Sequence, residues 1–427
     1  MKHIILLGKP SILMVVYIFP NQLNKTILFV GGGLETVPGI QLAKSKGLHV
    51  VVSDQNPNAP GMEIADDRIL ASTYNIEQTL DAVTHYHNQQ RSINGVMCMA
   101  TDVPLTVASI ADHLGLPGIP VTAAQLTSDK MLMKDCFKEN GLSIPWYCEI
   151  FNSNELETLV QQRGFPLVIK PVDSRGARGV LRLTEGIDLD WAFSLSKSYS
   201  PTGRVMVEEY LEGPQVSTES LVVNGRIYTI GFSDRNYEFL DTYAPYIIEN
   251  GGDLPSYLPQ YQQQLIRDEV EKTAKVLGIT NGVIKGDMVL CQNKAYIIEV
   301  ATRLSGGYFC SHEIPLNTGV DFVGSAIKLT LGETIKIEEL SAKFNQPVSQ
   351  RYFFPNPGKI IKINIPKWVQ TNHHVKMCQL RFKPGDIIPE LTEHPARAGV
   401  VITTGETKQE ATQLAQRVVR EVEITTL

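Results

Sequence analysis

The stretch that decides the fold runs from Gly282 to Gly307 and reads GVIKGDMVLCQNKAYIIEVATRLSGG. Two β-rich runs, 286–291 and 295–301, flank the polar residues 292–294, and asparagine accepts the left-handed conformation that a tight turn needs. The stretch therefore predicts a β-hairpin. Folding it about Asn293 predicts three facing pairs, which are Cys291 with Ala295, Val289 with Ile297, and Asp287 with Glu299.

This pairing places two carboxylates side by side. Directly opposed side chains lie about 4.5–5.5 Å apart at Cβ, and two carboxylates about 5 Å apart repel by about 3 kcal/mol at an effective dielectric constant of 20. A bound divalent cation would remove the conflict, and the two oxygen ligands suit Mg²⁺ that keeps waters and phosphate oxygens. Side-chain alternation places Arg303 on the same face, where it could bind a phosphate. The alternative is two surface carboxylates on an edge hairpin with a salt-bridging arginine.

Composition narrows the class of protein. The chain of 427 residues allows about two to four domains. Its formal charge of −6 argues against a nucleic-acid-binding protein. Its six cysteines lack CxxC spacing, which is typical of free thiols in a reducing compartment. Neither apolar run in residues 1–24 reaches the ~18 residues of a membrane span. We therefore expect an extra strand or an ordered extension there, in preference to a signal peptide. We also expect no membrane partner and a cytoplasmic location.

The first part of the chain alternates strands and helices. A buried strand at 25–30 leads into Gly31-Gly32-Gly33, then a helix and a second strand that ends at Asp54. Further alternation to about residue 121 predicts an open parallel α/β sheet. The glycines and Asp54 imitate a dinucleotide-binding site, although Thr36 stands where a third glycine is expected. A nicotinamide-dependent oxidoreductase is therefore one alternative function.

A second site signal lies near the middle of the chain. The apolar strand FPLVIKP (165–171) buries Lys170, and a buried lysine needs an anion. The following loop, 172–180, contains glycines, Ser174 and two arginines, so it could close over phosphates. The alternative is an ordinary exposed hairpin turn. After about residue 345, strands and a closing helix predict a small α+β domain.

Five segments occur in an order that resembles the ATP-grasp superfamily, in the branch that includes L-amino-acid ligases, biotin carboxylase and carbamoyl-phosphate synthetase. They are SDKMLMKDCFKENG (128–141), FPLVIKPVDSRGARGV (165–180), VMVEEYLEGPQVS (205–217), GDMVL with YIIEVATR (286–303) and TGVDFVGSAIKLTLGE (318–333). The resemblance implies a multidomain α/β and α+β fold. We expect an open parallel α/β domain at 25–121, an ATP-grasp domain of two subdomains at 122–340 with a mobile part at about 145–205, and an α+β domain at 341–427.

The resemblance also implies roles for individual residues. ATP would bind to Lys130, Lys170, the lid residues Ser174, Gly176 and Gly179, the hinge residues Glu208, Glu209 and Leu211, and Gln215. Asp287 and Glu299 would hold Mg²⁺ or Mn²⁺, and Arg303, Arg178 and Ser305 would act in catalysis. Family members often have glutamate at the position of Gln215 and asparagine at that of Ala301, which removes one ligand from the metal side.

The implied reaction is a two-step ligation, in which a carboxylate becomes an acyl-phosphate and an amine then displaces the phosphate. Biotin carboxylases carry an acid soon after the arginine, whereas this chain has glycines at 306 and 307, which favours an amino-acid or similar small carboxylate substrate. We also expect an amine acceptor and a homodimer. An ATP-binding protein without ligase chemistry is the second alternative. Asp287→Asn and Glu299→Gln should each abolish turnover and leave thermal stability without metal equal or higher, because each relieves the repulsion between the two carboxylates.

Overall fold

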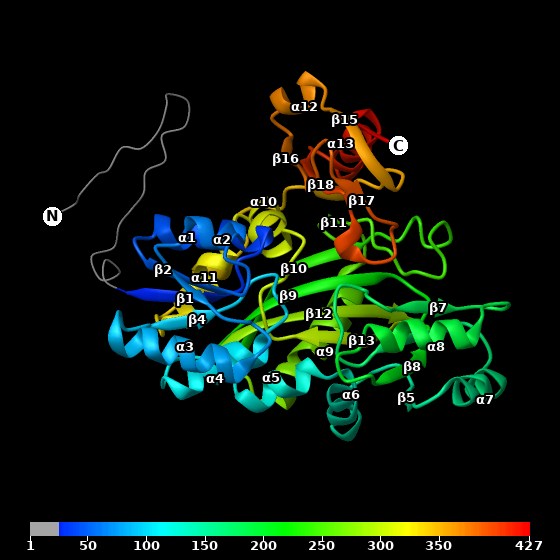
Figure 1. Ribbon diagram of the computed structural model, residues 1–427, viewed down its shortest axis with the longest axis horizontal. Coiled ribbons are helices and arrows are strands. Elements are labelled where there is room, and N and C mark those ends of the chain that lie inside the picture. Colours follow the sequence, from blue (N-terminus) through cyan, green and yellow to red (C-terminus); the bar gives the residue numbers. More distant parts are fainter. Residues whose placement is uncertain (1–24) are drawn as a thin grey trace.

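A computed structural model describes residues 25–427, so the extension expected at 1–24 lies outside the described residues (Figure 1). No helix within 25–427 is long and apolar enough to cross a membrane. The chain forms an N-terminal α/β unit, a small antiparallel sheet and a large mixed unit that carries the C-terminal strands.

The N-terminal unit is a parallel sheet, as predicted, in the order β3-β2-β1-β4. Its strands are β1 (Thr26–Val30), β2 (His49–Asp54), β3 (Asp67–Leu70) and β4 (Gly95–Met97). The helices between and after them are η1 (Leu34–Thr36), α1 (Val37–Ser45), α2 (Pro60–Ile64), α3 (Ile76–Gln89) and α4 (Pro104–His113). Strands β1 and β2 read as almost continuous apolar runs because helices cover both of their faces.

The glycine turn after β1 has a structural explanation. Gly31 has a φ of +97°, and a Cβ at this position would lie 2.4 Å from Oγ1 of Thr101. The backbone N–H of Gly32 donates to Oδ2 of Asp54 at 2.8 Å, and the N–H of Asn56 donates to Oδ1 at 2.9 Å. One oxygen of the acid on which the dinucleotide alternative depends therefore holds the glycine turn in place, and the other binds the chain just after β2.

The small antiparallel sheet has the strand order β5-β8-β6-β7 and is packed under two helices. Its elements are β5 (Tyr147–Ile150), α7 (Ser153–Arg163), β6 (Leu167–Pro171), β7 (Leu181–Leu183), α8 (Leu189–Ser198) and β8 (Val205–Glu209). Helices α5 (Val121–Ser128) and α6 (Lys130–Glu139) precede it. This sheet occupies the region predicted as the smaller subdomain, and its strand β8 extends a few residues past the expected limit of about 205.

The large sheet has eight strands in the order β13-β12-β9-β10-β11-β14-β18-β16. They are β9 (Gln215–Val223), β10 (Arg226–Arg235), β11 (Gly252–Leu254), β12 (Gly282–Cys291), β13 (Lys294–Ala301), β14 (Val348–Tyr352), β16 (Val375–Leu380) and β18 (Gly399–Thr404). Because β11 pairs with β14, the sheet continues across the boundary expected at 340/341. The C-terminal strands therefore share a backbone hydrogen-bond network with the centre of the molecule.

The remaining elements cover this sheet or complete the C-terminal part. Helix α9 (Gln260–Val276) packs on β12 and β13. The π-helix η2 (Phe309–Glu313), α10 (Ile314–Thr318), α11 (Phe322–Thr330) and η3 (Ile337–Leu340) connect the hairpin to β14. The C-terminal part adds β15 (Gly358–Asn364), α12 (Lys367–Thr371), β17 (Ile387–Ile388), η4 (His394–Ala396), α13 (Lys408–Glu421) and β19 (Glu423–Thr426).

The deciding hairpin forms as predicted, with one correction to its register. The turn has two residues, Gln292 and Asn293, both with positive φ, so Cys291 pairs with Lys294, Leu290 with Ala295, and Met288 with Ile297. The predicted pairs of Cys291 with Ala295 and Val289 with Ile297 are wrong by one residue. A bulge at Ile298 takes up the difference, and Asp287 pairs with Glu299 as predicted.

Candidate active site

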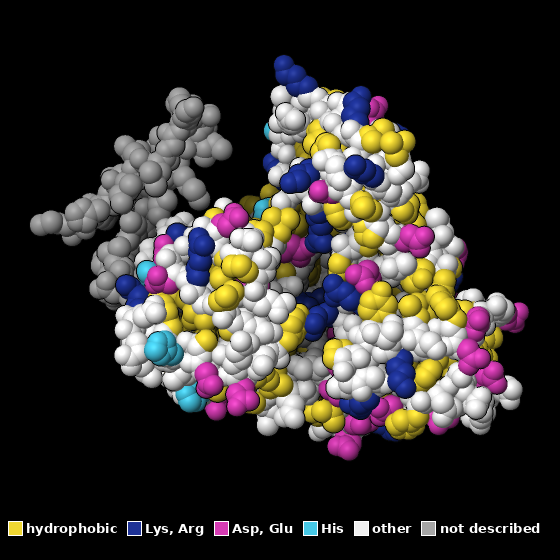
Figure 2. Space-filling view, in the orientation of Figure 1, with side chains coloured by type: hydrophobic (Ala, Val, Ile, Leu, Met, Phe, Trp, Pro, Cys, Tyr) yellow, Lys and Arg dark blue, Asp and Glu magenta, His cyan; other side chains and the backbone are white. Residues whose placement is uncertain are grey.

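A cavity of about 780 Å³ lies where the three units meet. Its walls come from the glycine turn after β1, the small sheet, the loop 174–180, the large sheet and the segment 394–397. Figure 2 shows Lys and Arg side chains gathered in the hollow between these parts. On the hairpin, Lys285, Asp287 and Val289 face the cavity, whereas Met288 and Leu290 pack in the core under α9. The bulge lets the consecutive residues Ile298 and Glu299 both line the cavity.

The anion that Lys170 needs is Glu208. The ammonium of Lys170 donates to Oε1 of Glu208, and Lys134 lies 2.9 Å from Oε2. Burial disfavours the charged carboxyl of Glu208, but the two lysines outweigh it and lower its pKa. Burial lowers the pKa of Lys134 to about 8 although Glu208 opposes the shift. Lys170 and Glu208 both line the cavity, so a phosphate there would meet a lysine that is already positioned by its counterion.

Lys130 joins the lid to the hairpin. It is the first residue of α6, directly after Asp129, whose carboxylate caps the helix. Its ammonium donates to the backbone oxygen of Ser174 at 2.7 Å and lies 3.5 Å from Oε1 of Glu299. Lys130 therefore contacts both the predicted lid and one predicted metal ligand.

The lid loop is closed against two other parts of the chain. Its Gly176 and Gly179 have positive φ, as its sharp turns require. The backbone oxygen of Gly176 accepts a hydrogen bond from the N–H of His394 at 3.0 Å, and Nε of Arg178 lies 3.2 Å from Oε1 of Glu393. Arg175 stacks on the ring of Tyr74, 3.9 Å from its centroid. Arg178 lines the cavity, but its side chain is held by Glu393.

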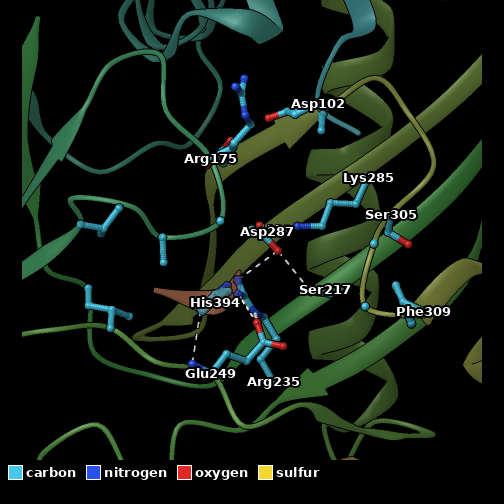
Figure 3. Close-up of a pocket in the computed structure, with 18 of the residues that line it drawn as sticks. Asp102, Arg175, Ser217, Arg235, Glu249, Lys285, Asp287, Ser305, Phe309 and His394 are labelled. Carbon is cyan, nitrogen blue, oxygen red and sulfur yellow. Dashed lines mark hydrogen bonds and ion pairs between the residues drawn. The ribbon is translucent and has the colours of Figure 1, made fainter. Parts of the chain in front are cut away.

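Asp287 is surrounded by cations and donors (Figure 3). Oδ1 lies 3.0 Å from Nη1 of Arg235 and accepts a hydrogen bond from the hydroxyl of Ser217 at 3.1 Å, while Lys285 donates to Oδ2. Burial opposes ionisation of Asp287, but Arg235 and Lys285 lower its pKa well below the usual range. The carboxylate is therefore charged and compensated by cations of the chain itself.

Asp287 and Glu299 fit a magnesium nucleotide better than a metal held by protein alone. Within 25–427, no group of three or more His, Cys, Asp or Glu side chains is arranged to hold a metal. Mg²⁺ commonly takes one or two carboxylates and completes its shell with water and phosphate oxygens. The paired carboxylates on one cavity wall match this habit, and Ala301, which also lines the cavity, adds no ligand. Asp287 would have to exchange a contact with Lys285 or Arg235 for the metal.

Arg303 follows β13 and lies between the N-terminal unit and the large sheet. Its Nε is 3.4 Å from Oδ1 of Asp102, and both side chains line the cavity. Burial disfavours the charged guanidinium, yet Asp102 raises the pKa of Arg303, so it stays cationic. Arg303 is thus placed to meet a negative charge in the cavity.

Ser305 is tied to a carboxyl in the middle of β9. Its N–H donates to Oε1 of Glu219 at 2.8 Å, and its hydroxyl donates to Oε2. Burial raises the pKa of Glu219 to about 7, although the bonds from Ser305 act in the opposite direction. The predicted catalytic serine lines the cavity, and its hydroxyl proton is engaged by Glu219.

The predicted adenine side also lines the cavity. Glu209, Leu211 and Gln215 lie on or directly after β8 and at the start of β9. The backbone N–H of Glu209 donates to the oxygen of Trp146, while its side chain is exposed. All of the predicted site residues except Lys130 and Gly179 line the same cavity, and Lys130 contacts two that do.

Sequence reasoning missed a second charged group in the cavity. Nε of Arg235 donates to Oε2 of Glu249 at 2.9 Å, and the N–H of Glu249 lies 3.4 Å from Nε2 of His394 (Figure 3). Burial opposes ionisation of Glu249, but Arg235 lowers its pKa. Arg235 ends β10, Glu249 lies 14 residues further along the chain, and His394 is distant in sequence, so no motif connects the three.

Two protein-family models match this chain. Residues 127–307 match the ATP-grasp domain, and residues 351–426 match the L-amino acid ligase C-terminal domain 2. A D-alanine–D-alanine ligase from Azoarcus sp. (strain BH72) is 26% identical over 201 residues, which are 46% of this chain and 64% of that protein.

Two solved structures share the fold. The structure of an L-amino acid ligase from Bacillus licheniformis aligns with a TM-score of 0.79 and 21% identity over 95% of this chain and 100% of that chain. The biotin carboxylase domain of a 2-oxoglutarate carboxylase from Hydrogenobacter thermophilus, a dimer in complex with MgADP, aligns with a TM-score of 0.71 and 17% identity over 95% and 91%.

Proposed function

Because this chain belongs to the ATP-grasp family of carboxylate–amine ligases, we propose that it activates an amino acid or a similar small carboxylate with ATP and joins it to an amine. The observation that carries the proposal is the single cavity in which the paired acids Asp287 and Glu299 face Lys170 and Arg303. Lys170 belongs to the small sheet and Arg303 to the turn after β13, so two distant parts of the chain contribute these cations to one cavity.

The nucleotide phosphates would lie among the cations of the cavity. Lys170 and the lid provide positive charge and backbone donors on one side, and Lys285 and Arg303 provide it on the other. Phosphoryl transfer depends mainly on positioning and on neutralising the charge of the transferred group. In this proposal Asp287 and Glu299 hold magnesium at the phosphates, and the closed lid keeps water away from them.

Bound Mg-ATP would supply the phosphoryl group that makes the substrate carboxylate a good acyl donor. A carboxylate oxygen forms a bond to the γ-phosphorus while the bond to the β-phosphate oxygen breaks, which releases ADP. The amine nitrogen then bonds to the acyl carbon, the carbon–oxygen bond to phosphate breaks, and the nitrogen loses a proton. Arg303, held by Asp102, is placed to stabilise negative charge during both steps.

The test is ADP release from Mg-ATP in the presence of an acid and an amine. The ligase proposal requires release when both are supplied from a mixed amino-acid pool, with a condensed product in mass spectrometry. Arg303→Met should reduce the rate by about 100-fold or more, the size of effect seen when one charge-stabilising donor is removed. Repeating the assay with Mn²⁺ checks whether it replaces Mg²⁺.

Two other outcomes would point to the alternatives. Nucleotide binding without ADP release in any pool would favour an ATP-binding protein without chemistry. This is the second candidate because Asp287 is already paired with Arg235 and Lys285, and because position 301 is an alanine. A change in NAD(H) absorbance would favour the oxidoreductase, but both oxygens of Asp54 already accept backbone N–H groups.

We also propose that the protein acts in the cytoplasm as a homodimer. The six cysteines are all free thiols, which suits a reducing compartment. Light scattering after size-exclusion chromatography measures the mass directly. A single species of about 47 kDa would contradict the dimer.

A further inference from the structure

Glu313 is a buried acid that nothing in the described chain neutralises. It is the last residue of the π-helix η2 and is 3% exposed. Its side chain lines the cavity. Among residues 25–427, no hydrogen bond or ion pair to its carboxyl is found, although its backbone N–H donates to the oxygen of Tyr308. Burying a charged group without a partner is costly, so the empty cavity disfavours the ionised form of Glu313.

The charged groups around Glu313 increase this cost. Burial raises the pKa of its carboxyl well above the usual range, and Glu249, Asp253 and Glu219 shift it in the same direction. Arg351 lowers the pKa of Glu313, but its Nη2 lies 2.9 Å from Oδ2 of Asp253, so Arg351 is already paired with another carboxylate. The surroundings therefore offer this carboxyl no cation of their own.

The cavity is thus lined by groups of both charge types. Lys170, Lys285 and Arg303 are cations that suit phosphates, whereas Glu313 is an acid without a side-chain partner among residues 25–427. A cationic group of a ligand would provide the missing partner and remain within the same enclosed space. The cation that the proposed substrates carry is an ammonium group, which has three donors for a carboxylate.

We propose that Glu313 binds the ammonium group of an amino-acid substrate and so makes this ligase selective for amino acids over carboxylic acids without an amino group. The inference rests on the proposed function for its substrate class. The raised pKa favours the protonated carboxyl in the empty cavity, so Glu313 releases its proton to solvent as the ammonium enters and forms a charge-assisted hydrogen bond with it. The proposal assigns Glu313 to substrate selection and leaves phosphoryl transfer to the basic residues.

The test compares Glu313→Gln with the matched control Glu338→Gln, which changes an exposed glutamate of η3 outside the cavity. ADP release is measured with a pool of L-amino acids and with a pool of acetate, propionate, isobutyrate and 3-phenylpropionate. We expect Glu313→Gln to raise KM for the amino-acid pool about tenfold or more, which is the loss expected for a hydrogen bond to a charged group. Affinity for Mg-ATP should be unchanged, and Glu338→Gln should match the unmodified protein.

A binding measurement separates failure of this inference from failure of the proposed function. Thermal stabilisation by the same pools with a non-hydrolysable ATP analogue reports substrate binding without turnover. The amino-acid pool should stabilise the unmodified protein but not Glu313→Gln, and the pool without amino groups should stabilise neither. Absence of ADP release would reject the ligase function, while this arm would still test Glu313.

Three results would overturn the inference. One is a KM of Glu313→Gln within twofold of the unmodified protein. Another is equal stabilisation of the unmodified protein by both pools, or by neither. The third is a requirement for K⁺ that Glu313→Gln removes without changing KM for amino acids, because the acid would then hold an inorganic cation.

Discussion

Replacing Asp287 by asparagine tests how the charges of the hairpin are balanced. The sequence alone suggests that the variant relieves repulsion with Glu299 and is at least as stable. The structure reverses this expectation, because Asp287 is paired with Lys285 and Arg235, and the three side chains are only 13–18% exposed. Asp287→Asn would leave Lys285 without this counterion, whereas Arg235 keeps Glu249.

The magnitude follows from that arrangement. Removing one partner of a buried ion pair costs about 3–5 kcal/mol, and the remaining partner of Arg235 reduces this to about 2–3 kcal/mol. With a urea slope of about 3 kcal/mol/M, the unfolding midpoint should fall by about 0.8 M. Glu299→Gln serves as the control, because Glu299 is 32% exposed and lies 3.5 Å from Lys130. Its loss should stay below about 1 kcal/mol.

The assay is urea unfolding followed by circular dichroism at pH 7 without metal or nucleotide. Because a protein of several units need not unfold in two states, midpoints and slopes are compared among variants and not converted to absolute stabilities. Lys285→Met combined with Asp287→Asn should be more stable than Asp287→Asn alone, since it removes the stranded cation. A midpoint of Asp287→Asn at or above that of the unmodified protein would refute the argument and show that repulsion from Glu299 dominates.

Three further predictions follow from the same contacts. Burial and Arg397 lower the pKa of His394 to about 3, below the ~6.5 of an unfolded chain. The unfolded state therefore binds the proton first, and the folded state loses stability as pH drops from about 6.5 towards 3. His394→Gln should reduce the change in urea midpoint between pH 7 and pH 5. Asp54→Ala should lower the free energy of unfolding by about 1–2 kcal/mol, because it leaves backbone N–H groups unpaired. ADP release should be unchanged. Arg178→Ala should slow ADP release more than Glu393→Gln, because only Arg178 lines the cavity, while both should cost less than about 1 kcal/mol in unfolding.

Local patterns predicted the parts of the fold that depend on neighbours in sequence. Period and turn chemistry identified the parallel sheet and the hairpin, and the pairing of Asp287 with Glu299 is confirmed. The predicted pairs between the turn and the Asp287–Glu299 pair were wrong by one residue. The sequence alone does not show whether Lys294 belongs to the turn or to the strand. The acid pair was nevertheless predicted correctly, because the shorter turn and the bulge shift the register by one residue in opposite directions.

The charge partners could not be predicted, because they come from distant segments. Lys170 was expected to need an anion, but its counterion Glu208 lies 38 residues away and was predicted to be a hinge residue of the ATP site. Lys134 occurs in a helix that reads as amphipathic, and only the packed structure shows that it is fully buried. The link between Arg235, Glu249 and His394 requires the C-terminal segment to be placed first.

The pairing of β11 with β14 has a practical consequence for dividing the gene. Ending the protein near residue 340 would leave β11 with bare backbone donors and acceptors, which promote aggregation. It would also remove His394, Pro395 and Arg397 from the cavity wall. Chimeras that exchange the last 80 or so residues between relatives should therefore alter substrate handling as well as solubility, and the safer crossover points lie in loops outside the shared sheet.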